Sequence, residues 1–202
     1  MIKKKFLTLV SVLLFLSFIF FSYLVAKELF TRVDFDRSWD LPFSVLSIVG
    51  SLEITGLIWV VIFVYLLLKR KFLTSLSLLL LPIALAIELF GKVFVYHPGP
   101  PFLFYRGVLN FNFPSHYIST DYSYPSGHVL RTSFLLIFLI LIILFKGKRF
   151  LNLSIAFFLF VFLLLMLISR IYLGEHWTSD VIGGLLLGGS LGLLSATTYK
   201  VS

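Results

Sequence analysis

The sequence predicts an all-α integral membrane protein built as a bundle of six transmembrane helices. Of its 202 residues, 59% are hydrophobic and only 13% are charged, whereas soluble domains usually carry about 25% charged residues. The mean hydropathy of +1.05 is correspondingly high. Alternation of apolar and polar residues never persists along the chain, so the sequence does not predict a transmembrane β-barrel.

Six apolar runs approach or exceed the length of about 20 residues that a membrane-spanning helix needs. The first run is longer than the apolar core of a secretory signal, about 7–15 residues, so we expect a retained helix. The fourth run is short and is expected to extend back through His128. No internal repeat or linker is found, so residues 1–202 are expected to form one six-helix domain. The expected spans are residues 6–26, 43–68, 72–94, 129–145, 150–168 and 181–198.

Charged residues divide between the two ends of this expected bundle. Because basic residues concentrate in cytoplasmic loops, both termini are expected in the cytoplasm. The lack of cysteine and the compact loops favour a prokaryotic plasma membrane. The same charge distribution explains the net charge of +8 without a nucleic-acid partner. On the side of the termini lie ten basic and no acidic residues: Lys3, Lys4, Lys5, Lys69, Arg70, Lys71, Lys146, Lys148, Arg149 and Lys200. On the other side, or in nearby span ends, lie all nine acidic residues: Glu28, Asp34, Asp36, Asp40, Glu53, Glu88, Asp121, Glu175 and Asp180.

Small residues form a seam along the last span. Gly184, Gly188 and Gly192 repeat every four residues, and such a pattern lets another helix approach closely. We expect the seam to serve packing within the chain, and a homodimer face is the alternative.

A first polar cluster on the non-cytoplasmic side is Tyr124-Pro125-Ser126-Gly127-His128. Proline ends the preceding chain segment and serine is a favourable N-cap, so a helix is expected to begin here. A helix N-terminus offers unpaired N–H groups and a partial positive charge, which suit a phosphate. The alternative is an ordinary capped helix with an interfacial histidine.

A second polar cluster on that side is Ser169-Arg170, followed by His176 and Asp180. A carboxylate that binds one imidazole nitrogen fixes the tautomer and leaves the other nitrogen free to attack. Arg170 can hold phosphate oxygens in a bidentate fork. The alternative is an Arg–Asp pair at the membrane edge with a surface histidine.

Lys92, near the end of the third span, adds a cation on the same side. Glu88 lies one turn earlier, so the alternative is a simple i,i+4 ion pair. Because the chain has no cysteine, disulfides, thiolate metal sites and cysteine-based phosphatase chemistry are excluded.

These clusters resemble signatures of the type-2 phosphatidic acid phosphatase superfamily, which includes membrane lipid phosphatases, soluble acid phosphatases and vanadium haloperoxidases. Ser169-Arg170, His176 and Asp180 have the spacing of its third signature. Pro125-Ser126-Gly127-His128 is similar to the second signature. The order of spans also agrees, and the resemblance covers roughly residues 88–190.

The first signature departs from the family's pattern, which is a lysine, six residues and then Arg-Pro. Counting from Lys92 leads to Gly99-Pro100, so the arginine is missing. For Arg131 the alternative is pairing with a protein carboxylate such as Glu88. Three residues could replace the missing charge: Arg106, Arg131 and His97.

The resemblance implies a metal-free reaction without a cofactor. His176 would attack phosphorus to form a phosphohistidine, Asp180 would orient His176, and His128 would protonate the leaving oxygen. The phosphate would be held by Lys92, Ser126, Gly127 and Arg170. The implied substrate is the phosphate or diphosphate monoester headgroup of a membrane lipid. Undecaprenyl-type carrier-lipid diphosphate, phosphatidic acid and phosphatidylglycerol phosphate all remain open.

Other functions also remain open. Phosphoryl transfer to another lipid would use the same phosphoenzyme, and a catalytically weak phospholipid-binding relative would agree with the missing arginine. A transporter is disfavoured because the ionisable residues gather at one face and not at the midplane. A zinc site is disfavoured because its candidate ligands lack a compact spacing, namely His97, His116, His128 and His176.

Overall fold

The computed structural model describes residues 4–26, 36–109, 113–114, 120–147 and 150–200. Over these residues the predicted all-α fold is confirmed, since the regular structure is helical and no strand occurs. The α-helices are α1 Lys4–Val25, α2 Asp40–Val49, α3 Leu52–Leu68, α4 Phe72–Ser77, α5 Leu80–Phe94, α6 Gly127–Phe145, α7 Phe150–Tyr172 and α8 Thr178–Thr197. Two short 3-10 helices, η1 Arg37–Trp39 and η2 Phe102–Phe104, lie in the connections.

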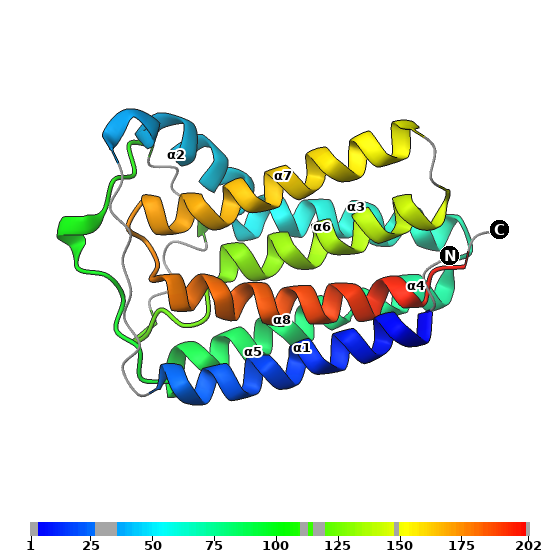
Figure 1. Ribbon diagram of the computed structural model, residues 1–202, viewed down its shortest axis with the longest axis horizontal. Coiled ribbons are helices and arrows are strands. Elements are labelled where there is room, and N and C mark those ends of the chain that lie inside the picture. Colours follow the sequence, from blue (N-terminus) through cyan, green and yellow to red (C-terminus); the bar gives the residue numbers. More distant parts are fainter. Residues whose placement is uncertain (1–3, 27–35, 110–112, 115–119, 148–149, 201–202) are drawn as a thin grey trace.

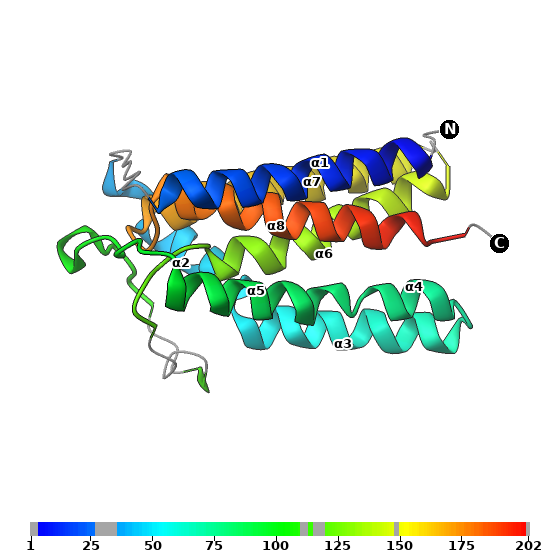
Figure 2. The ribbon, with the colours of Figure 1, turned by 90° about the horizontal axis from the view of Figure 1, so that it is seen from below.

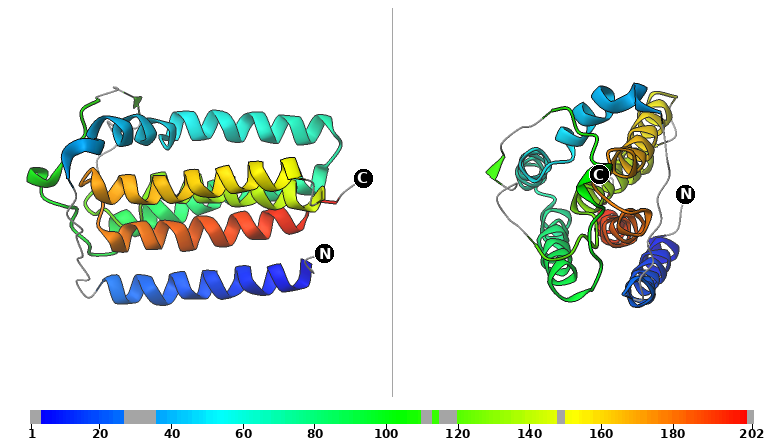
Figure 3. Two further views of the ribbon diagram at one scale, coloured as in Figure 1. Left: turned by 45° about the horizontal axis from the view of Figure 1, so that its top comes forward. Right: turned by 90° about the vertical axis from the view of Figure 1, so that its left-hand side faces the viewer.

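The long helices run side by side along the molecule (Figure 1). Seen along the bundle, α6 lies in the middle, with α3 and α5 on one side and α7 and α8 on the other (Figure 3). Helix α1 packs against α8 on the outside (Figure 2). Both ends of the chain lie at one end of the bundle, where Lys71 Nζ donates to the carbonyl oxygen of Lys200 at 2.7 Å. The basic cluster before α4 and Lys200 after α8 therefore lie at one end, as the charge pattern predicts.

Five helical segments are long and apolar enough to cross a membrane, and a sixth is added if one bent pair counts as a span. The five segments agree with predicted runs, and α6 begins at Gly127, so the fourth span extends back through His128 as expected. Helix α7 continues past the predicted end at residue 168 to Tyr172. Arg170 therefore lies in the last turn of α7 and does not follow it.

The segment predicted as one span, residues 43–68, is not one continuous helix. The chain breaks at Gly50–Ser51, and the segments before and after the break meet at a bend of 45°. Ser51 has an extended backbone and its Oγ accepts a hydrogen bond from the N–H of Ile54 at 3.3 Å, so it begins α3 as an N-cap. Hydropathy alone did not reveal this start signal because apolar residues flank it on both sides.

The glycine seam of α8 packs against α6, which confirms the prediction of internal packing. A Cβ atom at Gly184 would lie 2.5 Å from the carbonyl oxygen of Ser126, and one at Gly192 would lie 2.5 Å from that of Phe134. Gly188 is still tighter, because its Cβ would collide with the carbonyl oxygen of Leu130. The two backbones therefore approach closely over much of their length. The homodimer face considered as the alternative is not tested by this packing.

Gly188→Ala should lower the free energy of unfolding by about 1–3 kcal/mol, the usual cost of overfilling a packed interior. The matched control is Gly56→Ala in α3, where no atom lies within 4 Å of the added Cβ. Unfolding of the purified protein in detergent, followed by tryptophan fluorescence, measures both variants. Equal stability of the two variants would show that the seam tolerates a side chain.

Candidate active site

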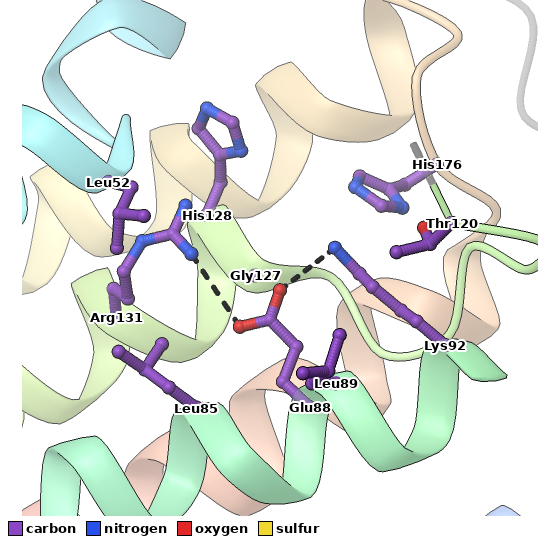
Figure 4. Close-up of a pocket in the computed structure, with 10 residues that line it drawn as sticks. All are labelled: Leu52, Leu85, Glu88, Leu89, Lys92, Thr120, Gly127, His128, Arg131 and His176. Atoms are coloured by element: carbon purple, nitrogen blue, oxygen red, sulfur yellow. Dashed lines mark ion pairs between the residues drawn. The ribbon is translucent and has the colours of Figure 1, made fainter. Parts of the chain in front are cut away.

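A cavity of about 240 Å³ lies at the end of the bundle away from the chain termini. Its walls come from α3, α5, α6 and the connections before α6 and α8 (Figure 4). Both histidines of the predicted site point into it. The lining residues are Leu52, Leu85, Glu88, Leu89, Lys92, Thr120, Gly127, His128, Arg131 and His176.

The first polar cluster forms the N-terminus of α6 at this cavity. Ser126 occupies the N-cap position, but its side chain makes no capping hydrogen bond, and its buried Oγ has no partner among the described residues. The backbone N–H of Ser126 donates instead to the carbonyl oxygen of Asp180 at 3.0 Å. Gly127 and His128 follow in the first turn and line the cavity. The first cluster is thus tied directly to α8, which carries Asp180.

The second polar cluster forms the predicted His–Asp pair. His176 Nδ1 lies 3.1 Å from Asp180 Oδ2, which also accepts the backbone N–H of Trp177 at 3.0 Å. The other carboxylate oxygen, Oδ1, lies 3.1 Å from His97 Nε2, and Asp180 is fully buried. Within the described residues the second nitrogen of His176, Nε2, has no hydrogen-bond partner, and the ring faces the cavity (Figure 4).

Burial lowers the pKa of the His176 imidazole below its ordinary value of about 6.5, because removal from water disfavours the charged ring. The hydrogen bond and the negative charge of Asp180 act in the opposite direction and moderate this shift. The balance lies on the side of the neutral ring, which carries a lone pair on the nitrogen that faces the cavity.

Two cations line the cavity and share one carboxylate. Lys92 Nζ lies 2.8 Å from Glu88 Oε1, so the i,i+4 pair considered from the sequence is formed. Arg131 Nη1 lies 3.6 Å from Glu88 Oε2, and its Nη2 donates to the carbonyl oxygen of Gly50 at 3.2 Å. The dashed lines of Figure 4 show this bridge from Lys92 through Glu88 to Arg131.

The guanidinium of Arg170 is buried but is absent from the cavity wall. Its side chain binds Ser47 of α2 and Glu175 of the connection before α8, and only 1% of the residue is exposed. Nη1 and Nη2 are directed to these two partners, whereas the buried Nε has no partner among the described residues. The phosphate contact expected for Arg170 stays a prediction.

The three candidates for the missing arginine lie in different places. Arg131 lines the cavity. The Arg106 guanidinium lies over the ring of Tyr172, 5.3 Å from its centroid. His97 is fully buried, and its Nε2 lies 2.9 Å from Ser179 Oγ, behind Asp180 when viewed from His176. Only Arg131 among the three belongs to the cavity wall.

Two features of the site were not predicted from the sequence. His97 is a second histidine on Asp180, and no motif connects these two positions. Glu88 bridges two cavity cations, whereas the sequence suggested a pair with Lys92 or with Arg131 separately. A carboxylate inside an apolar run was a visible signal, because such groups need partners near a bilayer. Within the described residues, no group of three or more His, Asp or Glu side chains is arranged to hold a metal ion, and His116 lies outside them.

The family model described as the PAP2 superfamily matches residues 73–201. This match covers more than half of the chain, and the protein therefore belongs to the PAP2 superfamily. Membership confirms the resemblance inferred from the two polar clusters. The matched range begins at the second residue of α4 and extends through α8, so it contains every histidine and cation described in the cavity.

Two relatives share parts of the sequence. The chain is 35% identical over 115 residues to the Escherichia coli (strain K12) protein named "Putative undecaprenyl-diphosphatase YbjG", an alignment that covers 56% of this chain and 52% of that protein. It is 42% identical over 76 residues to the "Undecaprenyl-diphosphatase" of Sulfolobus acidocaldarius, covering 38% of this chain and 33% of that protein. The alignments thus span about half and one third of the length of these relatives.

A solved structure shares the fold. The transmembrane PAP2 type phosphatidylglycerolphosphate phosphatase from Bacillus subtilis superposes with a TM-score of 0.60 and 21% identity, covering 96% of this chain and 94% of that one. This likeness, together with five or six apolar helices of spanning length, shows that the protein is a multi-pass membrane protein.

Asp180→Asn should lower the pKa of His176 further, because it removes a negative charge that favours the imidazolium. The wild-type imidazole should take up its proton at a lower pH than an ordinary histidine, because burial disfavours the charged ring, and the variant should do so at a lower pH still. The imidazole ¹⁵N chemical shifts, followed through a pH titration in detergent micelles, report both values. Asp121→Asn, which removes an exposed carboxylate on the same side, is the control and should change nothing. A raised pKa in Asp180→Asn would contradict the assigned partner.

Proposed function

We propose that the protein is a lipid phosphatase that hydrolyses the phosphate or diphosphate monoester headgroup of a membrane lipid. One observation carries the proposal: His176 is held by Asp180 through Nδ1 and turns its other nitrogen into a cavity that also contains His128 and two cations. A nucleophile, an acid and positive charge around one small space are the parts that phosphoryl transfer requires.

In the proposed reaction, His176 Nε2 attacks phosphorus, so an N–P bond forms while the P–O bond to the leaving group breaks. A protonated His128 gives its proton to the leaving oxygen. A water molecule then attacks the phosphorus of the phosphohistidine and gives a proton to His128 while the N–P bond breaks. This step releases inorganic phosphate and returns His176 to its neutral form and His128 to its protonated form. Asp180 orients the ring and stabilises its positive charge while the phosphoenzyme exists. These steps need neither a metal ion nor a cofactor.

The charge on the phosphoryl oxygens is proposed to be stabilised by Lys92, Arg131 and the N-terminus of α6 at Ser126 and Gly127. Support comes from their common place at the cavity and from the preference of helix N-termini for anions. Arg170 would join them only after leaving Glu175 and Ser47. In this proposal Arg131 supplies the charge that the first signature lacks.

The proposed substrate is a lipid on the non-cytoplasmic side of the plasma membrane. The basic residues at the opposite end of the bundle support this orientation through the positive-inside rule, with six spans and both termini in the cytoplasm. The names of the E. coli and Sulfolobus relatives favour a carrier-lipid diphosphate. The name of the Bacillus structure keeps phosphatidylglycerol phosphate as a second substrate to test.

His176→Ala should abolish phosphate release, because no other histidine in the cavity is paired with a carboxylate in this way. The assay uses purified protein in detergent with EDTA, and it offers a carrier-lipid diphosphate and phosphatidic acid in parallel. Size-exclusion chromatography verifies that the variant is folded. Substantial turnover by the folded variant would remove His176 as the nucleophile. No release by the wild type from either lipid would favour a phospholipid-binding role.

Arg131→Ala should lower kcat/KM by about 100- to 1000-fold, the usual loss when one charge-stabilising contact is removed. Arg106→Ala is the matched control and should cost far less, because its guanidinium lies over Tyr172 and not on the cavity wall. Gly99→Arg restores the family's arginine at a position that accepts a Cβ atom without a clash, since the nearest atom, Ser123 Cβ, would lie at an ordinary contact distance of 3.6 Å. In the Arg131→Ala background it should recover part of the activity. A larger loss in Arg106→Ala than in Arg131→Ala would reassign the role.

A further inference from the structure

Glu88 is a buried carboxylate that the proposed reaction does not use. It lies on α5 with only 7% of the residue exposed, and it lines the cavity beside the two histidines. Its two oxygens contact different cations, Oε1 at 2.8 Å from Lys92 Nζ and Oε2 at 3.6 Å from Arg131 Nη1. Both cations belong to the set assigned to the phosphoryl group.

The same carboxylate lies against the N-terminus of α6. A Cβ atom added to Gly127 would collide with Oε1 of Glu88 and would come within 2.7 Å of Arg131 Nη1. Figure 4 shows the carboxylate beside Gly127, between Lys92 and Arg131, on the cavity side of α5. Glu88 therefore already contacts three of the groups that a phosphoryl group would need: the lysine, the arginine and the first residue of the helix.

We propose that Glu88 is a resident anion of the phosphoryl subsite, which an incoming phosphate has to displace. The inference rests on the proposed function. A carboxylate and a phosphate carry charge of the same sign, accept hydrogen bonds through oxygens, and are favoured by the same cations and helix N-termini. They cannot occupy the same space, so Glu88 weakens the binding of a lipid headgroup or of free phosphate. It sets affinity without forming or breaking a bond.

A second role for Glu88 predicts a different response to substitution. If the carboxylate only balances the charge of Arg131, its position against Gly127 has no importance. Glu88→Asp keeps the charge but withdraws the carboxylate by one methylene group. Glu88→Gln removes the charge and leaves a side chain of nearly the same size. The two variants together separate occupation of the subsite from charge balance.

Binding of inorganic phosphate to the purified full-length protein in detergent, measured by isothermal titration calorimetry, tests the proposal without turnover. Glu88→Gln should bind phosphate roughly tenfold more tightly than the wild type, since one repelling charge is removed from beside the ligand. Glu88→Asp should also bind more tightly, by a smaller factor. Asp121→Asn, an exposed carboxylate on the same side, should bind as the wild type does.

Equal or weaker phosphate binding by folded Glu88→Gln would overturn the proposal. An unchanged affinity in Glu88→Asp would also overturn it, in favour of charge balance. Should Glu88→Gln fail to fold, Glu88→Asp alone decides, because it retains the charge that Arg131 and Lys92 need.

Turnover assays with the same variants identify which phosphate competes with Glu88 and keep the two proposals separate. A lower KM for lipid in Glu88→Gln supports competition with the headgroup, whereas tighter phosphate binding with an unchanged KM supports competition with the released product. Lipid hydrolysis by the wild type, with phosphate affinity unchanged by Glu88→Gln, would overturn this inference alone. Tighter phosphate binding in the variants without hydrolysis by the wild type would overturn the proposed function and leave an anion site in which Glu88 resides.

Discussion

The close approach of α6 and α8 is the constraint on which the site depends. Glycine at 184, 188 and 192 lets the backbone of α8 lie against the carbonyl oxygens of α6. At the cavity end the same contact includes the hydrogen bond from the N–H of Ser126 to the carbonyl oxygen of Asp180. The start of one helix and the first turn of the other are thus fixed to each other. His128 and the Asp180–His176 pair therefore face one space although they come from different helices.

The ionisable side chains inside this end of the bundle are partnered in small groups. Asp180 lies between two histidines, Glu88 between Lys92 and Arg131, and Arg170 binds Glu175. Partnering of this kind is expected where water is excluded, because an isolated buried charge is strongly destabilising. It also means that the cavity does not present bare positive charge to a ligand. Each cation that a phosphate could use is already engaged by a carboxylate of the protein.

Much of this arrangement follows from local sequence. The spacing of His176 and Asp180 predicted their contact, and Pro125-Ser126-Gly127 predicted the start of α6, because both depend on residues close in the chain. The orientation of Arg170 could not be predicted, since it depends on Ser47, far away in the sequence, and on where α7 ends. The break in the second predicted span was missed because hydropathy averages over a window and does not register one capped helix start. The position of Arg131 at the cavity wall, where Arg106 and His97 do not lie, likewise depends on how the helices pack.

At the bend at Gly50–Ser51, the N-terminal part of the chain contacts residues that line the cavity. The carbonyl oxygen of Gly50 is free of the α2 helix ladder and accepts a hydrogen bond from Arg131. The absence of a side chain there leaves room for the His128 ring, whose Cδ2 would lie 3.0 Å from a Cβ at this position. Gly50, which provides this carbonyl oxygen and this space, precedes residue 73, where the match to the family begins. A fragment limited to the matched residues would therefore contain the two cavity histidines and the cations, yet it would lack part of the wall that orients them. Exchange of the N-terminal helices between family members would alter the site although every signature residue stayed the same.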